Sequence, residues 1–534
     1  MGLTRRRFLG RAPLGLLSCL PACAGSEEAP KVFPLTSDPF AHGVASGDPQ
    51  ADAVVLWTRV TPPEGPSGAE PGEQLVQWRI ALEPGLGQVI AQGSAKTNAE
   101  LDFTVKVDVR DLSPATTYYY EFSALGVRSS VGRTRTLPRG PAERARIGVV
   151  CCANYPAGFF NAYRLVAERA DLDFVLHLGD YLYEYGNGTF GDGAAIDRVP
   201  SPDREAVTLE EYRQRHAQYK TDPDLQEAHR QHPFIAIWDD HEVANNAYRE
   251  GAANHQPATE GDWAMRRAAA MRAYFEWMPI RAPELGSTQR VYRSFSYGNL
   301  MDLLLLDTRH ERDEHVSSNC DAVTLAEPSR TMLGAAQEQW LLAALKASQS
   351  RGARWRLVGQ QVMFAQLSDL AQGCVTQLDQ WDGYPAARDR VLTALQDGID
   401  NVVLLTGDAH SSWAFDIAGD PFDPARYTAA TGQGSVAVEF VVPGVTSPGP
   451  TGQVQAMLDS HPHLKFVDLV RRGYLLLDLT AERAQAEWYF MLSVAEPLGR
   501  EELGAIYRTG QGQNRLSLGE AASAPRADAP ALAP

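Results

Sequence analysis

Several apolar segments of this chain are followed directly by residues that can bind a metal ion or a phosphate. Asp180 ends one such segment, Asp239 and Asp240 end another, and Asp408 and His410 end a third. Burying several carboxylates together without a counter-charge is unfavourable, because they repel one another and lose water. A cluster of metal ions is the simplest explanation of this pattern. Separate helix caps and surface turns are the alternative.

These side chains need elements that bring them together, and the sequence from Arg146 onward has the pattern of an open α/β sheet. Apolar runs rich in Val, Ile and Leu alternate with segments of helical spacing, as expected for strands buried on both faces. Open sheets bind ligands in the crevice at the carboxyl ends of their strands. The predicted strands are residues 146–152, 173–180, 234–242, 301–309, 355–361, 401–410 and 436–444, and the predicted helices are residues 159–170, 263–277 and 335–348.

Residues 38–138 have a different pattern. Short alternating runs, broken by Pro, Gly and Ser clusters, predict an antiparallel β-sandwich. The segment LSPATTYYYEF, residues 112–122, is typical of a strand entry in a fibronectin-like domain. Nothing in this stretch of sequence points to catalysis. We therefore expect an amino-terminal all-β domain that serves as a packing or binding module.

The first 25 residues have the features of an export signal. TRRRFLG, residues 4–10, is followed by an apolar run from Leu14 to Leu20, which is too short to span a bilayer. This order resembles a twin-arginine signal, so the export machinery is a predicted partner. ACA, residues 22–24, suits simple cleavage, whereas LPAC, residues 20–23, resembles a lipoprotein box with Cys23 acylated. We expect a monomer that is periplasmic or secreted, either free or anchored through Cys23.

The composition excludes some classes of partner. The chain is 44% hydrophobic and 22% charged, and its formal net charge of −17 argues against nucleic acid or an anionic membrane surface. No other segment is long and apolar enough to span a membrane. Of six cysteines, two belong to the signal. Cys320 and Cys374 could form a disulfide in an oxidising compartment, although the sequence does not fix the pairing.

Four motifs together resemble the alkaline phosphatase D family, within the metallophosphoesterase superfamily. They are CCANYPAGFFNAY (151–163), HLGDYLYEYG (177–186), WDDHE (238–242) and GDAHSSW (407–413). This chain has DDHE where the wider superfamily has Asn-His, and GDAH where it has Gly-His-x-His, as this branch is expected to show. The resemblance covers nearly the whole chain. It implies an exported enzyme with a layered β-sheet core flanked by helices, acting on phosphate mono- and diesters.

The resemblance also implies a set of metal ligands. Asp180 is expected to bridge two cations, and Cys152, Tyr183 and His410 are expected to join it around ferric iron. A hard trivalent cation stabilises a phenolate, whereas a free phenol with a pKa of about 10 stays neutral. Further ions of the family are calcium, which prefers oxygen ligands, although other divalent metals fit such ligands as well. The oxygen donors assigned to calcium are Asp240 and Asp408. Asp239 is the weaker alternative to Asp240, and Asn246 would contact the ligands without binding the ion itself.

Three further residues are predicted to act on the substrate. His241 is expected to donate to a phosphoryl oxygen or to protonate a leaving group, and a histidine that only orients its loop is the alternative. Arg309 and Arg312, in DTRHERD, are expected to clamp phosphate, with solvated surface arginines as the alternative. His177 lies inside a strand and is expected in the core. Trp413 is expected either to line the pocket or to have only a structural role.

The predicted reaction is hydrolysis of a phosphate ester. The metals would polarise the phosphoryl oxygens while a metal-bound hydroxide or bridging oxide attacks phosphorus in line. A phospholipase-like or polymer-specific phosphodiesterase is an alternative that pocket loops such as residues 186–203 would decide. A cell-surface binding protein with a vestigial metal site is the alternative outside the enzymes. The intact residues Asp180, Asp240, Asp408 and His410 argue against it.

The predicted organisation has four parts. They are the signal at residues 1–25, the β-sandwich at 38–138, the catalytic domain at 145–505 and a tail at 506–534. REELGAIYRTG, residues 500–510, is compatible with a helix. The last residues, AASAPRADAPALAP, have the composition of a disordered segment. In the resembling family a carboxy-terminal helix can cover the active site, and this tail is a candidate for that role.

Overall fold

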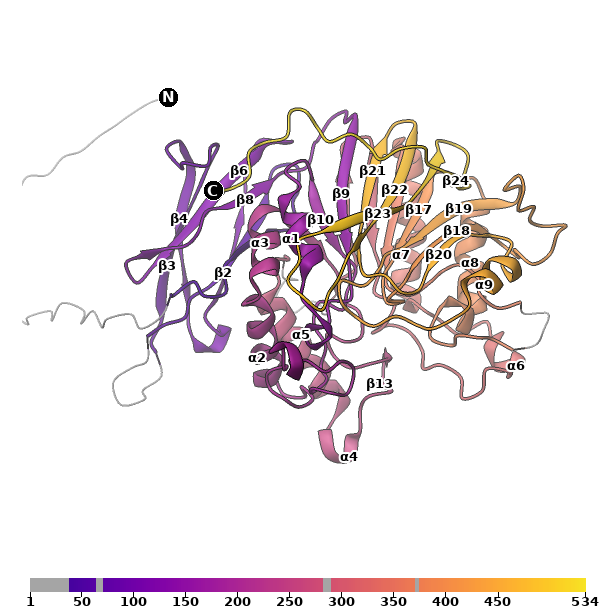
Figure 1. Ribbon diagram of the computed structural model, residues 1–534, viewed down its shortest axis with the longest axis horizontal. Coiled ribbons are helices and arrows are strands. Elements are labelled where there is room, and N and C mark those ends of the chain that lie inside the picture. Colours follow the sequence, from indigo (N-terminus) through magenta and orange to yellow (C-terminus); the bar gives the residue numbers. More distant parts are fainter. Residues whose placement is uncertain (1–37, 64–70, 282–289, 370–373) are drawn as a thin grey trace, which may run out of the picture.

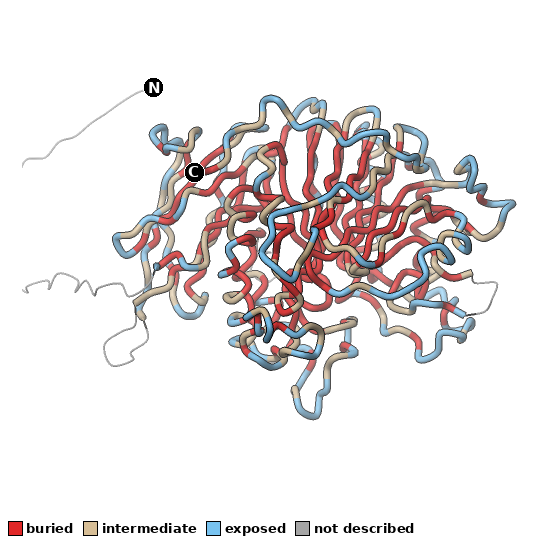
Figure 2. The backbone as a smooth tube through the Cα atoms, viewed as in Figure 1, coloured by how far each residue is buried: buried red, intermediate tan, exposed pale blue. Residues whose placement is uncertain are grey.

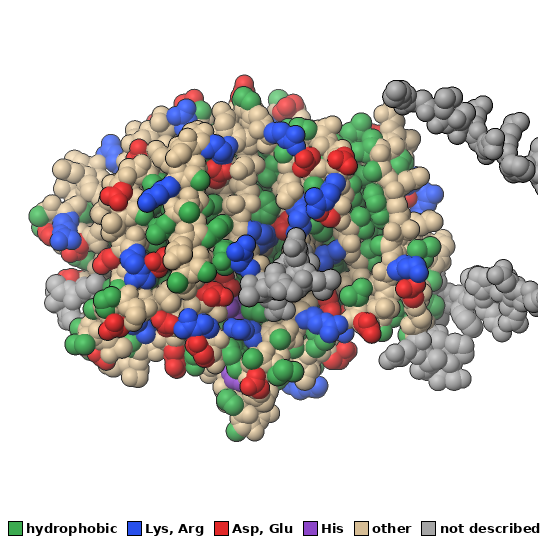
Figure 3. Space-filling view, turned by 180° about the vertical axis from the view of Figure 1, so that it is seen from behind, with side chains coloured by type: hydrophobic (Ala, Val, Ile, Leu, Met, Phe, Trp, Pro, Cys, Tyr) green, Lys and Arg blue, Asp and Glu red, His purple; other side chains and the backbone are tan. Residues whose placement is uncertain are grey.

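The computed structural model describes residues 38–63, 71–281, 290–369 and 374–534. The predicted export signal and Cys23 lie outside the described residues. Within these ranges, no helix is both long enough and apolar enough to cross a membrane. On the face of the molecule in Figure 3, Lys and Arg side chains are interspersed with Asp and Glu.

Two sheets form the centre of the molecule (Figure 1). The strands β9, β10, β11 and β1 of the first sheet run parallel to one another, as do β15, β16, β17 and β19 of the second. The first sheet has the order β24 (Ser517–Leu518), β23 (Glu501–Gly510), β22 (Arg483–Met491), β21 (Gly473–Thr480), β9 (Arg144–Val150), β10 (Phe174–His177), β11 (Pro233–Ala236), β1 (Val44–Gly47), β2 (Val54–Arg59) and β5 (Thr104–Val109). The second has the order β14 (Arg293–Tyr297), β15 (Met301–Leu305), β16 (Trp355–Gln360), β17 (Val402–Thr406), β19 (Ser435–Val441), β18 (Ser412–Ala418) and β20 (Leu464–Asp468).

The main core lies between these sheets, and alternation along the strands shows how it is divided. Leu303 and Leu305 of β15 join the apolar cluster shared with β9, β10 and β21, whereas Leu304 faces the helices. The second sheet is covered by α7 (Gly334–Arg351) and α8 (Pro385–Gln396). The first is contacted by α1 (Asn161–Glu168) and α3 (Pro223–Gln231). The predicted layered sheet core flanked by helices is confirmed, and Figure 2 shows the buried residues concentrated in its strands.

The amino-terminal β region is joined to the catalytic core by backbone hydrogen bonds. One of its sheets is β4 (Val89–Thr97), β3 (Gln74–Ala81), β6 (Thr117–Ala124) and β7 (Val127–Arg128), with β8 (Gly132–Arg135) on β6. The other, formed by β1, β2 and β5, continues the large catalytic sheet, because Ser46 and Gly47 pair in parallel with Pro233 and Phe234 of β11. The predicted all-β region is confirmed. It has its own apolar core cluster, but its sheet does not end at the boundary with the catalytic core.

Helices connect and brace the same region. The helices α2 (Leu209–Lys220) and α5 (Trp263–Trp277) pack against each other. A capping box between Thr208 and Glu211 begins α2, and the side chain of Asp262 caps α5, as expected from the backbone N–H groups that every helix start leaves without partners. The remaining helices are short: α4 (Pro257–Glu260), α6 (Ala322–Leu325) and α9 (Val454–Ser460).

The sequence of residues 500–510 is compatible with a helix, but the structure has a strand here. These residues form β23, which pairs antiparallel with β22 along its whole length. The segment has good helix formers, but the free edge of β22 offers a row of backbone hydrogen bonds that an extended segment satisfies better. Tertiary pairing therefore overrides local propensity.

The tail beyond β24 follows a defined course, which differs from the predicted disorder. The carbonyl of Ala524 accepts hydrogen bonds from Arg144 and Arg146, and that of Ala533 accepts one from Gln231. Figure 1 shows the carboxyl end beside β6 and β8. Arg144 begins β9, so the tail contacts the amino-terminal ends of the parallel strands. It does not cover the crevice at their carboxyl ends.

Arg526 is the strongest tether of this tail, and its loss should release it. Its guanidinium binds both oxygens of buried Asp173, at 2.9 and 2.6 Å. We expect Arg526→Ala to lower the free energy of unfolding by about 1–3 kcal/mol, because Asp173 keeps other partners but loses its bidentate one. Urea unfolding and limited proteolysis of the tail measure the effect. Arg508→Ala removes an exposed pair with Glu520 and serves as the control. Unchanged stability and a protected tail in Arg526→Ala would contradict the tether.

Candidate metal centre

The side chains predicted from sequence meet where the parallel strands of both sheets end. Cys152 follows β9, Asp180 follows β10, and Asp239, Asp240 and His241 follow β11. From the second sheet, Arg309 follows β15, and Asp408 and His410 follow β17. The two sheets thus contribute to one crevice, as expected for open parallel sheets.

Four of the predicted ligands share an uncommon backbone conformation. Cys152, Asp180, Asp408 and His410 have φ angles of 58°, 53°, 56° and 50°, in the left-handed region that residues other than glycine rarely adopt. Each such residue raises the free energy of the native state by about 1–3 kcal/mol and persists only where surrounding contacts enforce it. Here the N–H of Cys152 donates to the carbonyl of Gly179, and that of Ala153 to the carbonyl of Asp180. These sharp turns aim the side chains inward.

Cys152, Asp180, Tyr183 and His410 form the first cluster. The Tyr183 hydroxyl donates to Asp180 Oδ2 at 2.8 Å and lies 3.0 Å from His410 Nε2. Cys152, Asp180 and His410 place potential ligand atoms within 4.8 Å of one another. Burial raises the pKa of Tyr183 well above its ordinary value, so its phenol is neutral unless a cation lies beside it. Ser447 Oγ also donates to that phenol, at 2.6 Å.

The second cluster is acidic and is continuous with the first. Asp180 groups with Asp240 and His241, and Asp240 also groups with Asp239 and Asp408. Among the described residues, Asp180, Asp239 and Asp240 each have one buried oxygen that accepts no hydrogen bond. Buried polar atoms almost always have a partner, and these three lie on two loops, which follow β10 and β11. The donor set, oxygens beside an imidazole and a thiol, fits bound cations.

Arg309 and Arg312 are buried, so the alternative of solvated surface arginines is wrong. Arg309 binds Asp239 through Nε, Asp379 through Nη1 at 2.7 Å and Asp408 through Nη2. Arg312 Nη2 binds Asp379 at 2.6 Å, and its Nε and Nη1 donate to backbone carbonyls. Both guanidinium groups therefore donate their hydrogen bonds to protein groups, and their positive charge compensates the buried carboxylates.

His241 is held by a carboxylate outside the acidic cluster. Its Nδ1 lies 2.7 Å from Glu184 Oε2, and its ring centroid lies 4.2 Å from that of Tyr183. Burial lowers the pKa of His241, but the carboxylates of Glu184, Asp240 and Asp180 outweigh it and raise the pKa well above the ordinary value. Because Nδ1 faces Glu184, Nε2 is the atom left to face Asp180 and Asp240. It is placed to donate a proton or to bind a cation.

Sequence reasoning missed four residues that support the site. Glu242 accepts from the backbone N–H groups of Asp180, Tyr181 and Asp239. The other three are Glu184, Asp379 and Gln380, and Gln380 Nε2 donates to Asp408 Oδ2 at 2.7 Å. Glu184 and Glu242 lie in motifs that the sequence analysis recognised. Their role was missed because nothing in the sequence indicates that a side chain will hydrogen-bond to neighbouring residues of the folded site.

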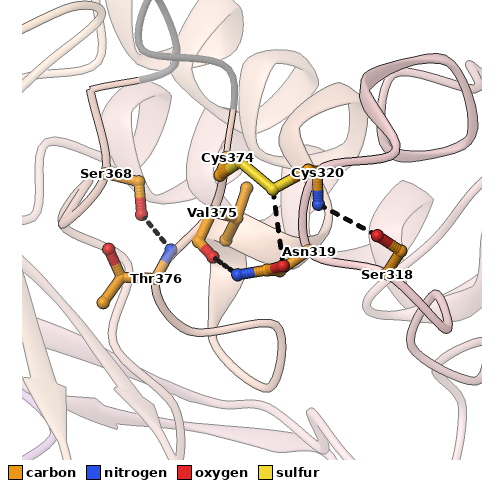
Figure 4. The surroundings of a disulfide bond; sticks show 7 residues. All are labelled: Ser318, Asn319, Cys320, Ser368, Cys374, Val375 and Thr376. Atoms are coloured by element: carbon orange, nitrogen blue, oxygen red, sulfur yellow. Dashed lines mark hydrogen bonds between the residues drawn. A yellow bond between two sulfur atoms is a disulfide. The ribbon is translucent and has the colours of Figure 1, made fainter.

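Asp379 and Gln380 had no sequence signal at all, because no strand precedes them. Their loop is attached nearby by the Cys320–Cys374 disulfide, a pairing that the sequence allowed but did not fix. Figure 4 shows this disulfide beside the hydrogen bond from Asn319 Nδ2 to the carbonyl of Val375. The disulfide and the salt bridges of Asp379 thus fix the same segment from two sides.

The remaining predictions fall outside the cluster. His177 is buried, with Nε2 2.8 Å from the Tyr163 hydroxyl, so its assignment to the core is confirmed. Asn246 supports Asp240 through its backbone N–H, at 2.6 Å from Oδ2. Trp413 is 6% exposed, donates to Ser411 Oγ and walls a cavity beside His410.

Comparisons with known proteins agree over most of the chain. The family described as PhoD-like phosphatase matches residues 147–488, and its N-terminal domain matches residues 26–138. Alkaline phosphatase D of Bacillus subtilis (strain 168) is 36% identical over 511 residues, covering 92% of this chain and 85% of that protein. A solved structure titled "Structure of PhoD" has a TM-score of 0.83 at 34% identity, covering 92% of this chain and 94% of that one.

Proposed function

Because this chain belongs to the PhoD-like phosphatase family and is a metal-dependent phosphoric ester hydrolase, we propose that it hydrolyses both phosphate monoesters and diesters at the strand-end cluster. The observation that carries this proposal is the set of three buried carboxylate oxygens without partners, on Asp180, Asp239 and Asp240. Asp240 groups both with Asp180 and with Asp239, and Asp180 lies beside a thiol, a phenol and an imidazole. A substrate phosphate is the anion that cations held there would attract.

We propose two kinds of cation site. Cys152, Asp180, Tyr183 and His410 would hold ferric iron, because thiolate, phenolate and imidazole suit iron. Asp240 and Asp408, with Asp239, would hold calcium, because calcium prefers carboxylate oxygens. Cations at these sites would polarise phosphoryl oxygens and lower the pKa of bound water. Proton donation and the positioning of the ligands are assigned to side chains of the protein.

We assign His241 as the group that donates a proton to the ester oxygen. Glu184 orients the imidazole through Nδ1 and favours its protonated form, so Nε2–H can donate to a phosphoryl or leaving oxygen. Arg309 would have to release a carboxylate to clamp phosphate as the sequence suggests. We therefore assign Arg309 and Arg312 to positioning: they hold Asp239, Asp379 and Asp408 where the ligand oxygens converge.

We further propose that the protein works outside the cytoplasm as a monomer. The twin-arginine pattern at residues 4–10 supports a route for folded proteins, which suits an enzyme that must acquire iron before export. The Cys320–Cys374 disulfide suits an oxidising compartment. Protein carrying an acyl group on Cys23 would be anchored, and mass spectrometry of exported protein distinguishes the two forms.

The test is metal analysis and a visible spectrum of protein exported by its own signal. We expect bound iron and calcium, and an intense visible band from a ferric phenolate. Tyr183→Phe should lose the band and most hydrolysis of bis(p-nitrophenyl) phosphate, because the phenol is removed from Asp180 and His410. Tyr181→Phe is the control from the same motif, since its hydroxyl bonds His229 instead. Colourless, active protein containing zinc or manganese would refute the iron assignment, and folded protein without metal or hydrolysis would refute the function.

A further inference from the structure

A cavity of about 520 Å³ opens beside the metal cluster. Its walls come from the loop of Phe190, from Met363 and Leu367 after β16, from Trp413 of β18 and from Met457 of α9. Its volume lies within the range of sites that enclose a small organic molecule. Among the described residues that line it, His410 and Gln380 also contact the metal cluster.

The lining is apolar and almost without charge. Among the described residues that form it, none is Asp, Glu, Lys or Arg, and its titratable side chains are His410 and His461. The chain as a whole is 22% charged, so a lining without these residues is a distinctive feature. No Lys or Arg among the described residues lines the cavity to bind an additional phosphate or sulfate on the ligand. An uncharged group with a large apolar surface would gain from leaving water.

The cavity and the cluster share side chains. His410 faces Tyr183 with Nε2, at 3.0 Å, and lines the cavity with its ring. Gln380 lines it too and donates to Asp408 at 2.7 Å. Phe190 lies over the junction, with its ring centroid 5.6 Å from that of His410. The cavity therefore adjoins the cluster of Asp180 and Asp408.

We infer that the cavity is the subsite for one ester substituent, and that this substituent is an uncharged alkyl or aryl group. The inference rests on the proposed phosphoesterase function and specifies its substrate class. Met457 is a specificity-determining residue on this assignment. It is partly buried, and its methyl group lies against Gly452, on α9, a short helix without a fully buried residue.

Binding of phosphonates, which cannot be hydrolysed, tests the subsite apart from catalysis. With cation-loaded protein, we expect hexylphosphonate and phenylphosphonate to bind at least about 10-fold more tightly than methylphosphonate in calorimetry. Met457→Glu should lower the affinity for hexylphosphonate and phenylphosphonate by about 10-fold and leave the affinity for methylphosphonate unchanged. In hydrolysis, the same variant should raise KM for hexyl phosphate with little change in kcat, because the interaction is made before and during the reaction alike.

Met265→Glu is the matched control, because Met265 is 72% exposed on α5 and lies outside this cavity. It should behave as wild type. Equal affinity for methyl- and hexylphosphonate in wild type, or an equal loss in both methionine variants, would overturn the subsite and leave the phosphoesterase function intact. Loaded protein that neither binds methylphosphonate nor hydrolyses any ester would overturn the proposed function and the subsite with it.

Discussion

Asp180→Asn is expected to lower kcat/KM for phosphate-ester hydrolysis by about 1,000-fold or more and to empty both kinds of cation site. Among the described residues, Asp180 is the one that belongs to both the cluster of Cys152 and His410 and the acidic cluster. Its Oδ2 accepts from Tyr183, and its Oδ1 has no hydrogen-bond partner in the described part of the chain. Asparagine keeps the shape but replaces one anionic oxygen with a donor, so it cannot bridge two cations.

The loss should not come from unfolding. In the metal-free protein the Asp180 carboxylate is buried, but the positive charges of His241 and His410 and the hydroxyl of Tyr183 outweigh burial and lower its pKa. Removing this charge therefore costs some stability, so the thermal midpoint of metal-free Asp180→Asn should fall below that of metal-free wild type while the variant still unfolds cooperatively. Metal analysis, the visible spectrum and steady-state kinetics measure the remaining effects.

Asp302→Asn provides the matched control. Asp302 is also buried, but it lies near the amino-terminal start of β15 and binds Arg351 and Ser296. It should keep its metal content and nearly all of its activity. A fully metallated, active Asp180→Asn protein would contradict the shared-ligand assignment.

Arg309→Met is expected to lower the free energy of unfolding of the metal-free protein by about 3–5 kcal/mol. Arg309 is fully buried and is the common counter-ion of Asp239, Asp379 and Asp408. Methionine fills much of the same volume but removes the counter-charge of Asp239, and it leaves Asp379 with Arg312 and Asp408 with Gln380 as remaining partners. Adding calcium should restore much of the stability, because a cation that binds only the folded state stabilises it by mass action.

The deficit should grow with pH, for a reason that follows from linkage. Burial, opposed by Arg309, raises the pKa of Asp240 to about 6 in the folded protein, whereas an unfolded aspartate has a pKa near 3.9. A carboxyl group with a raised folded pKa binds more protons when folded, so stability falls as pH rises above about 4 and levels off once the folded pKa is passed. Removing Arg309 raises that pKa further. Urea unfolding at pH 5 and pH 8 should show the larger deficit at pH 8.

Arg312→Met is the control, because Arg312 binds one carboxylate and two backbone carbonyls. Its deficit should be smaller and much less sensitive to calcium, since Asp239 and Asp408 keep Arg309. Equal deficits in the two variants, with no rescue by cation, would show that Arg309 acts by packing alone.

Much of the candidate site was determined by the sequence, because its residues stand at strand ends. An apolar run followed by Gly-Asp or Asp-Asp-His indicates both a buried strand and the edge at which its polar residues emerge. Cys152, Asp180, Tyr183, Asp240, Asp408 and His410 were predicted in this way, with Cys152 and Tyr183 depending on the family resemblance. The structure brings all six together. The layered core and the all-β amino-terminal region followed from the same local patterns.

The tertiary structure decided the partners of those residues. The pairing of Arg309 with Asp239, Asp379 and Asp408 joins segments that are 70 to 99 residues apart, and no periodicity records such a meeting. The same holds for β23, whose helix-forming sequence is extended because β22 offers it an unpaired edge, and for β1, which joins the catalytic sheet through β11. Local pattern reports the face and the end of an element. Counter-charges, sheet edges and cavity walls depend on which distant segments the folded chain places side by side.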